Sequence, residues 1–148
     1  MKNFRLFGLA LFTLVLFIGC EKEPIEEADH NQQYDVYCYY AGVPASTLTL
    51  FIDGDSHGEL PALSTDPISP EAFSPGSPSP CQDDSVKALC YHTVLPSGHY
   101  TFKAKDVDGN TVASSNIHFT ASLLETSGGQ GGGSAAQSGT CLLVGLWE

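Results

Sequence analysis

Hydrophobic and polar residues alternate along much of the chain after residue 33. The clearest runs are residues 34–40 (YDVYCYY) and 47–53 (TLTLFID), and in the second run Leu48, Leu50 and Ile52 share one face. Alternation with a period of two predicts strands that are buried on one side. Because no segment shows helical periodicity, we expect an all-β, antiparallel β-sandwich over residues 34–148. Its further strands are expected at residues 57–63, 86–95, 99–106, 110–121 and 140–147.

Two long segments interrupt this pattern. Residues 64–80 contain five prolines and five serines. Since proline lacks an amide donor and disfavours helix before it, this segment is expected to be a loop. Residues 127–139 (SGGQGGGSAAQSG) have the composition of a flexible Gly/Ser-rich loop.

The turn signal Asp108-Gly109 makes the register of one hairpin testable. A two-residue loop there would place His99 opposite His118, on a polar face whose reverse side is apolar. Directly opposed Cβ atoms lie about 4.5–5.5 Å apart, close enough for the two rings to share a metal ion. A zinc site needs three or four ligands, and His92 is the only further candidate nearby. We therefore expect an exposed polar pair, with no metal and no other cofactor.

The first 19 residues have the composition of an export signal. Lys2 and Arg5 precede an apolar run over residues 6–18, which is too short to span a bilayer and is typical of a signal peptide. The run ends in FIGC (residues 17–20), which resembles the lipobox of bacterial lipoproteins, with Phe where Leu is usual. The resemblance implies cleavage before Cys20 and lipidation of its thiol. The alternative is an ordinary secretory signal that ends next to a cysteine by chance.

The chain is strongly acidic, with 17 acidic and six basic residues, and removal of residues 1–19 leaves four lysines, no arginine and a net charge of −13. This balance excludes nucleic acid as an expected partner, because phosphate binding relies on clustered Lys and Arg. Residues 20–33 are expected to form the lipidated cysteine and a flexible acidic tether. An acidic stretch at this place resembles the surface-export signal of Bacteroidota lipoproteins. We therefore expect an outer-membrane lipoprotein, held by its lipid anchor, that faces the cell surface or alternatively the periplasm.

A family resemblance extends from Pro80 to Cys141. The chain reads LPSGHYTF at residues 95–102 and KDVDGN at residues 105–110, with Cys141 just before the last apolar strand. This pattern resembles the small immunoglobulin-like β-sandwich lipoproteins of Bacteroidota. Because its motifs are turns and strands, the resemblance implies a fold and no activity.

Four cysteines remain for the domain: Cys38, Cys81, Cys90 and Cys141. In an exported chain of this size they predict two disulfides, and the sequence alone allows three pairings. A zinc site is less expected, since no two of them are closer than nine positions. The family resemblance implies the pair Cys81–Cys141, which leaves Cys38 and Cys90 to bridge neighbouring strands. The alternative is Cys81–Cys90 with Cys38–Cys141.

The aromatic residues of the first strand are candidates for ligand binding. Tyr37 and Tyr39 share a face with Asp35. If that face is outward, the two tyrosines would stack on sugar rings or contact a protein. The alternative is that they pack against the tether, a loop or a neighbouring strand.

Catalytic patterns are absent from the sequence, which has no G-x-S-x-G elbow and no H-E-x-x-H motif. We therefore expect a protein that is not an enzyme. The predicted function is that of a lipid-anchored cell-envelope protein acting as a non-catalytic binding or structural module. Its expected role is protein interaction or envelope assembly, in which a partner pairs with an exposed sheet edge. The alternative is an accessory surface lipoprotein that binds carbohydrate or metal.

Overall fold

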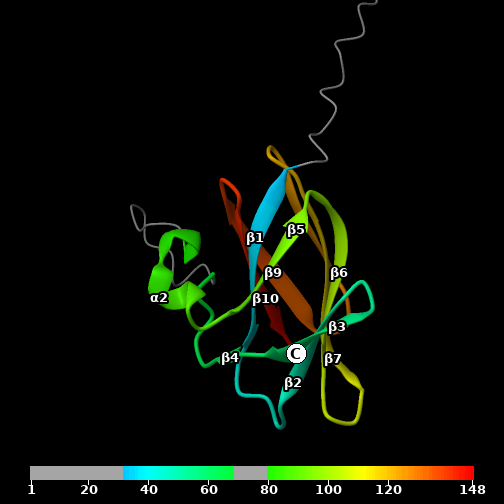
Figure 1. The fold of residues 1–148 in the computed structure, drawn as a ribbon. Coiled ribbons are helices and arrows are strands. Elements are labelled where there is room, and N and C mark those ends of the chain that lie inside the picture. The colour runs from blue at the N-terminus through cyan, green and yellow to red at the C-terminus, as the bar shows by residue number, and fades with distance from the viewer. Residues whose placement is uncertain (1–31, 69–79) are drawn as a thin grey trace, which may run out of the picture.

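The computed structural model describes residues 32–68 and 80–148 (Figure 1). Its elements are β1 (Gln33–Ala41), β2 (Leu48–Ile52), β3 (Asp55–Leu60), β4 (Ala62–Leu63), η2 (Pro80–Gln82), α2 (Asp84–Lys87), β5 (Tyr91–Pro96), β6 (Gly98–Lys105), β7 (Thr111–Phe119), β8 (Leu124–Gly128), β9 (Gly132–Ser138) and β10 (Cys141–Trp147). The predicted signal peptide, Cys20, most of the tether and most of the Pro/Ser-rich loop lie outside the described residues. Within the described residues, no helix has the length and apolar character needed to cross a bilayer.

The strands form two sheets that pack against each other (Figure 1). The first sheet has the order β4-β1-β10-β9, with β5 also paired to β1, and the second has the order β3-β2-β6-β7-β8. All pairs are antiparallel except those that β1 makes with β10 and β4. The prediction of an all-β fold is confirmed. The purely antiparallel arrangement is wrong for the first sheet, because the chain returns in β10 alongside β1 in the same direction.

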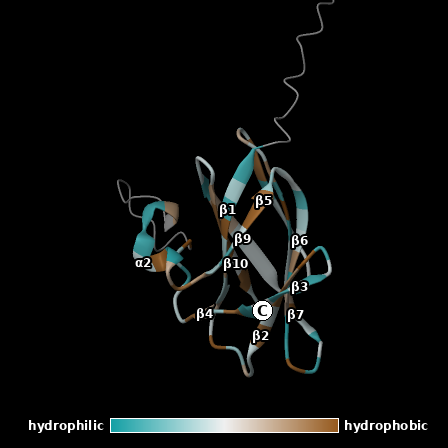
Figure 2. Ribbon diagram, viewed as in Figure 1, coloured by the Kyte–Doolittle hydropathy of each residue, from teal (hydrophilic) through white to brown (hydrophobic). Residues whose placement is uncertain are grey.

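The core between the sheets is built from alternate residues of the strands, as the period-two pattern requires. Figure 2 colours these strands by hydropathy and shows hydrophilic and hydrophobic residues mixed along them. The fully buried members include Val36 and Cys38 of β1, Leu50 of β2, Phe102 of β6, Ile117 and Phe119 of β7, and Leu142, Val144 and Leu146 of β10.

The first sheet is buried on its other face as well. Tyr39 and Leu143 lie on that face and form a second apolar cluster with Ile68 and Cys81. The segments around β4 and α2 supply its cover, so β10 is buried at five consecutive positions from Leu142 onward. Strands buried on both faces lose the alternation that marks half-buried ones.

The strand predicted over residues 86–95 is wrong in its first half. Residues Asp84–Lys87 form the short helix α2, and the strand β5 begins only at Tyr91. Asp83 caps the helix, since its carboxylate accepts the N–H of Ser85 at 2.9 Å. A side-chain cap of this kind satisfies an amide that a helix start leaves unpaired.

The flexible loop predicted over residues 127–139 is also wrong. Residues Leu124–Gly128 form β8, and Gly132–Ser138 form β9, which pairs with β10 along its whole length. The small side chains are needed for packing: a Cβ on Gly133 would lie 2.4 Å from Cβ of Ser115 in the facing sheet. A Cβ on Gly132 would lie 2.2 Å from the indole of Trp147. These glycines are therefore close-packing positions.

Only one of the two expected disulfides is present in the described residues. Cys81 and Cys141 are bonded, with their Cα atoms 5.8 Å apart, as the family resemblance implied. Cys38 and Cys90 are free thiols, so the second expected bridge is wrong. The reason is the alternation of strands: Cys38 is paired in register with Tyr91 and faces the core between the sheets, whereas Cys90 packs in the cluster on the opposite face.

The register predicted for the β6–β7 hairpin is confirmed. Tyr100 lies opposite Ile117, Phe102 opposite Ser115, and His99 opposite His118. Only the turn differs from a two-residue loop, because a register shift after Ala104 pairs the last residue of β6 with the first of β7 and leaves residues 106–110 as the connection.

Candidate functional site

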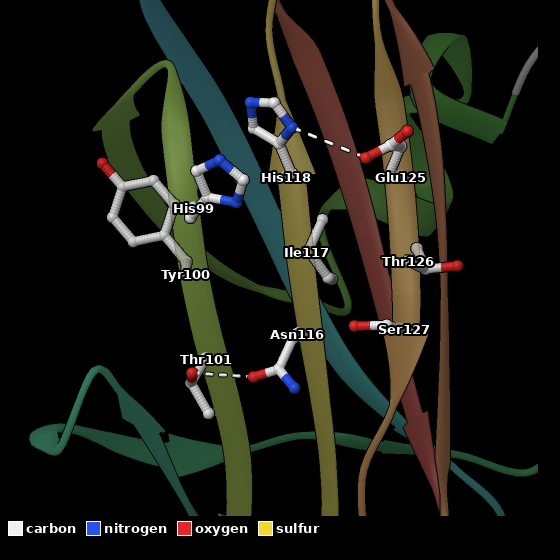
Figure 3. Close-up of a pocket in the computed structure, with 9 residues that line it drawn as sticks. All are labelled: His99, Tyr100, Thr101, Asn116, Ile117, His118, Glu125, Thr126 and Ser127. Carbon is white, nitrogen blue, oxygen red and sulfur yellow. Dashed lines mark hydrogen bonds and ion pairs between the residues drawn. The ribbon is translucent and has the colours of Figure 1, made fainter.

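An open groove of about 690 Å³ lies on the solvent side of β6, β7 and β8 (Figure 3). Its lining includes six polar side chains at alternate positions of the three strands, two from each strand: His99, Thr101, Asn116, His118, Glu125 and Ser127. We call this set the polar groove. The alternation of these strands explains it, because the intervening Phe102, Ile117 and Phe119 point into the core.

Strand register arranges the polar groove in two rows across the sheet. The histidine row is His99–His118–Glu125, and the amide row is Thr101–Asn116–Ser127. The two rows are two residues apart along each strand, a separation of about 7 Å. A ligand that touches both rows must therefore extend along the strands.

The two imidazoles of the histidine row are stacked. Their ring centroids are 3.6 Å apart and the planes are inclined by 11°. Nδ1 of His118 lies 3.8 Å from Oε2 of Glu125 (Figure 3). Since ring nitrogens present their lone pairs in the ring plane, stacked rings direct them along parallel planes and not at a common point.

The structure brings no third metal ligand to this pair. His92, the third candidate from the sequence, lies in the other sheet, where its Nε2 is 3.0 Å from Oδ1 of Asp35. No cluster of three His, Cys, Asp or Glu side chains suited to a metal ion occurs among the described residues.

The amide row has a hydrogen-bonding group, Nδ2 of Asn116, that is not used by any residue the structure describes. The hydroxyl of Thr101 donates to Oδ1 of Asn116 at 2.8 Å, which orients the amide and leaves its Nδ2 group directed away from Thr101 (Figure 3). The Thr101 backbone is held from the other side, because its N–H donates to Oδ1 of Asp53 at 2.7 Å. Asn116 thus presents a positioned donor on an open surface.

A basic and aromatic margin adjoins the polar groove on the same face. Lys103 follows Thr101 on the solvent side of β6 and is paired in register with Phe51 of β2. Nζ of Lys105 lies 4.5 Å from the centroid of the Phe51 ring, a cation–π geometry. The sequence pattern gives no signal for a role of these three residues, although the alternation of residues 47–53 places Phe51 opposite the core face.

The tyrosines predicted as ligand contacts lie elsewhere. Tyr39 is completely buried and its hydroxyl donates to Asp66. Burial, together with the Asp66 carboxylate, raises the pKa of the Tyr39 hydroxyl. The Tyr37 ring is stacked on the His92 ring, with the two ring centroids 4.7 Å apart. Nζ of Lys87 lies 5.8 Å from the centroid of the Tyr37 ring. Tyr39 therefore packs in the interior, and Tyr37 packs against the neighbouring strand β5 and the helix α2.

The acidic turn between β6 and β7 uses its own carboxylate. Asp106 accepts the N–H groups of Asp108 and Asn110 at 3.0 and 2.8 Å, and the side-chain amide of Asn110 at 3.0 Å. These hydrogen bonds, with that from the Asn110 side chain the strongest, lower the pKa of Asp106. All these hydrogen bonds lie within the turn, so the Asp106 carboxylate stabilises the turn itself.

Two members of the polar groove, Glu125 and Ser127, were missed because residues 124–128 carry no strand pattern. Their place follows only from the pairing of β8 with β7.

Compared with known proteins, the chain matches no family model, no curated protein and no solved structure.

Proposed function

We propose that this chain is a lipid-anchored cell-envelope protein whose β-sandwich is a non-catalytic binding module, with the polar groove as its binding surface. The anchor rests on the sequence: an apolar run that ends in Cys20 and an acidic stretch after it. The immunoglobulin-like character and the cell-surface location belong to the same proposal. The Cys81–Cys141 bond supports the family resemblance, because the resemblance implied that pair.

One observation carries the binding role. The polar groove presents six polar side chains on three adjacent strands, and Thr101 fixes the orientation of the Asn116 amide, whose donor has no partner among the described residues. Binding sites for small polar ligands combine concavity with a few such positioned groups. A surface that contacts only solvent does not require a side-chain amide held in one orientation.

Pairing of a partner with the edge strand β3 is the less favoured mode. Asp55 and Glu59 are both exposed on this strand. The register with β2 shifts at Phe51, and Gly58 takes a φ of 105°. Charges and irregular backbone on an edge strand oppose the addition of another strand. The face of the second sheet is therefore the better binding surface.

The anchor is tested by growing the expression host with an alkyne-tagged fatty acid. We expect label on the native chain and on Cys90→Ala, and no label on Cys20→Ala. Label on Cys20→Ala would refute the anchor. Protease treatment of intact cells then tests the location: digestion before lysis supports the cell surface, and digestion only after lysis assigns the domain to the periplasm.

The binding surface is tested by photo-crosslinking in those cells. Benzoylphenylalanine replaces Ser127 in the polar groove or, as the matched edge control, Glu59 on β3. We expect a defined adduct with one envelope component from position 127 and none from position 59. Adducts from position 59 alone, or from neither position, would contradict the polar groove as the binding surface.

A further inference from the structure

We infer that the polar groove binds an uncharged saccharide chain, an inference that rests on the proposed function and names its ligand class. The groove offers donors and acceptors side by side, and this mixture matches hydroxyl groups, each of which donates and accepts. Asn116 supplies a donor, Glu125 supplies acceptors, and the hydroxyl of Ser127 supplies both. A ligand with acceptors only, such as a phosphate, would meet the Glu125 carboxylate unfavourably.

Charge separates neutral from acidic saccharides. With residues 1–19 removed, the chain carries a net charge of −13, so a polyanion is repelled during approach. The two lysines nearest the groove, Lys103 and Lys105, offset only a small part of this net charge. An uncharged chain escapes the repulsion and still satisfies the hydrogen-bonding groups.

The histidine row suits the apolar side of a sugar ring. The two imidazoles, stacked at 3.6 Å, hold each other in place and leave their outer faces and their edges to a ligand next to the Asn116 amide. Such side chains have few rotatable bonds, so their ordering on binding costs little entropy. A sugar ring presents C–H groups on one side and hydroxyl groups at its rim. The C–H groups would contact the imidazoles of the histidine row, and the hydroxyl groups would bond to the amide row.

Shape indicates a chain and not a single sugar. The groove is open and crosses three strands, and its two rows are about 7 Å apart. A ligand that engages both rows spans more than one pair of contacts along β6 and β7. An open surface of this kind gains affinity by repeated contacts along a polymer.

The inference is tested by affinity gel electrophoresis of the full chain in detergent. Neutral polysaccharides (a soluble β-glucan, starch, a galactomannan and a xylan) are cast in one set of gels. Polygalacturonate and alginate are cast in a second set. We expect retardation by at least one neutral polymer that is unchanged by added salt. Loss of one positioned hydrogen bond in Asn116→Ala should weaken retention about tenfold, and His99→Ala should weaken it similarly.

His92→Ala is the matched control, because it removes an exposed histidine from the other sheet and should leave retention unchanged. Thermal unfolding of each variant verifies that the fold is intact. Retention that survives Asn116→Ala and His99→Ala overturns the inference, as does the absence of retention by every neutral polymer. Salt-sensitive retention by the acidic polymers alone also overturns it, yet leaves the proposed function standing if position 127 forms its adduct. Absence of that adduct and of all retention refutes both.

Discussion

Gly133→Ala tests whether the Gly/Ser-rich segment is a packed strand. A Cβ at this position would lie 2.4 Å from Cβ and 2.7 Å from Oγ of Ser115, and 3.2 Å from the carbonyl oxygen of Gly145. Real Cβ atoms do not approach another Cβ so closely, and Ser115 is completely buried. The two sheets must therefore move apart locally.

The expected cost follows from two opposing effects. Overpacking a well-packed interior destabilises by about 1–3 kcal/mol. Alanine also restricts the unfolded chain, which offsets about 0.4–1 kcal/mol. We expect the free energy of unfolding to fall by about 1–2 kcal/mol, which lowers Tm by about 4–8 °C for a domain of this size.

Gly128→Ala is the matched control in the same segment. A Cβ at Gly128 would have no atom within 4 Å, so this variant should be as stable as the parent or slightly more stable. Urea unfolding followed by tryptophan fluorescence measures both, since Trp147 is paired with Gly132 at the end of β10. Ser115→Gly removes the opposing Cβ, and the double variant should recover part of the stability lost in Gly133→Ala.

Equal free energies of unfolding for Gly133→Ala and Gly128→Ala would refute the close packing of Gly133 against Ser115. That result would mean that residues 127–139 form a flexible connection in solution.

Three further predictions concern the buried hydroxyl and the cysteines. Tyr39→Phe removes the hydrogen bond to Asp66 and should lower the free energy of unfolding by about 1.5–3 kcal/mol, measured by urea unfolding. Reduction of the Cys81–Cys141 bond should lower it by about 2–4 kcal/mol, measured with and without dithiothreitol. Burial raises the pKa of the Cys90 thiol to about 11 in the folded state, above the unfolded value of about 8.5. The free energy of unfolding should therefore be unaffected by this thiol below about pH 8.5 and should fall as the pH rises toward 11.

Each of these has a control. Tyr37→Phe should leave stability nearly unchanged, because the Tyr37 ring is held by His92 and Lys87; equal losses for both tyrosines would contradict the role of Asp66. Reduction with no effect would contradict a structural disulfide. Cys90→Ala should remove part of the alkaline loss, and the remainder should follow the Cys38 thiol, whose pKa burial also raises. A Cys90 thiol that iodoacetamide modifies rapidly at pH 8 would contradict its burial.

The sequence predicted the parts of the fold that depend on alternation and turns. The β6–β7 register follows from the Asp108-Gly109 turn and the split between apolar and polar faces, and with it the opposition of His99 and His118. Local chemistry was sufficient because the two strands are neighbours along the chain. The turn between β2 and β3 is equally local, with Asp53 and Gly54 both at positive φ.

The parts that failed depend on distant contacts. The backbone of β9 has no strand pattern of its own, and its glycines are explained only by Ser115 and Trp147, which approach from other strands. Pairing of the thiols failed because the sequence does not show on which face of the first sheet Cys90 lies. The polar groove was predicted only in part. Its two histidines follow from the predicted hairpin, whereas Glu125 and Ser127 join it through the pairing of β8 with β7, which the sequence pattern did not predict.

The parallel neighbours β1 and β10 determine when this domain can finish folding. Asp35 is paired with Cys141, 106 positions later in the chain. Every other described strand precedes β10 in the chain, so β1 can pair with β4 and β5 before β10 joins it, and closing the large loop to β10 is slow. The second sheet can form earlier from its own hairpins, while the edge of β1 that later pairs with β10 stays unpaired. Until β10 is in place, Cys38 lacks its native cover while Cys81 lacks its native partner, so we expect mispaired disulfides among Cys38, Cys81 and Cys90 to compete with the native bond.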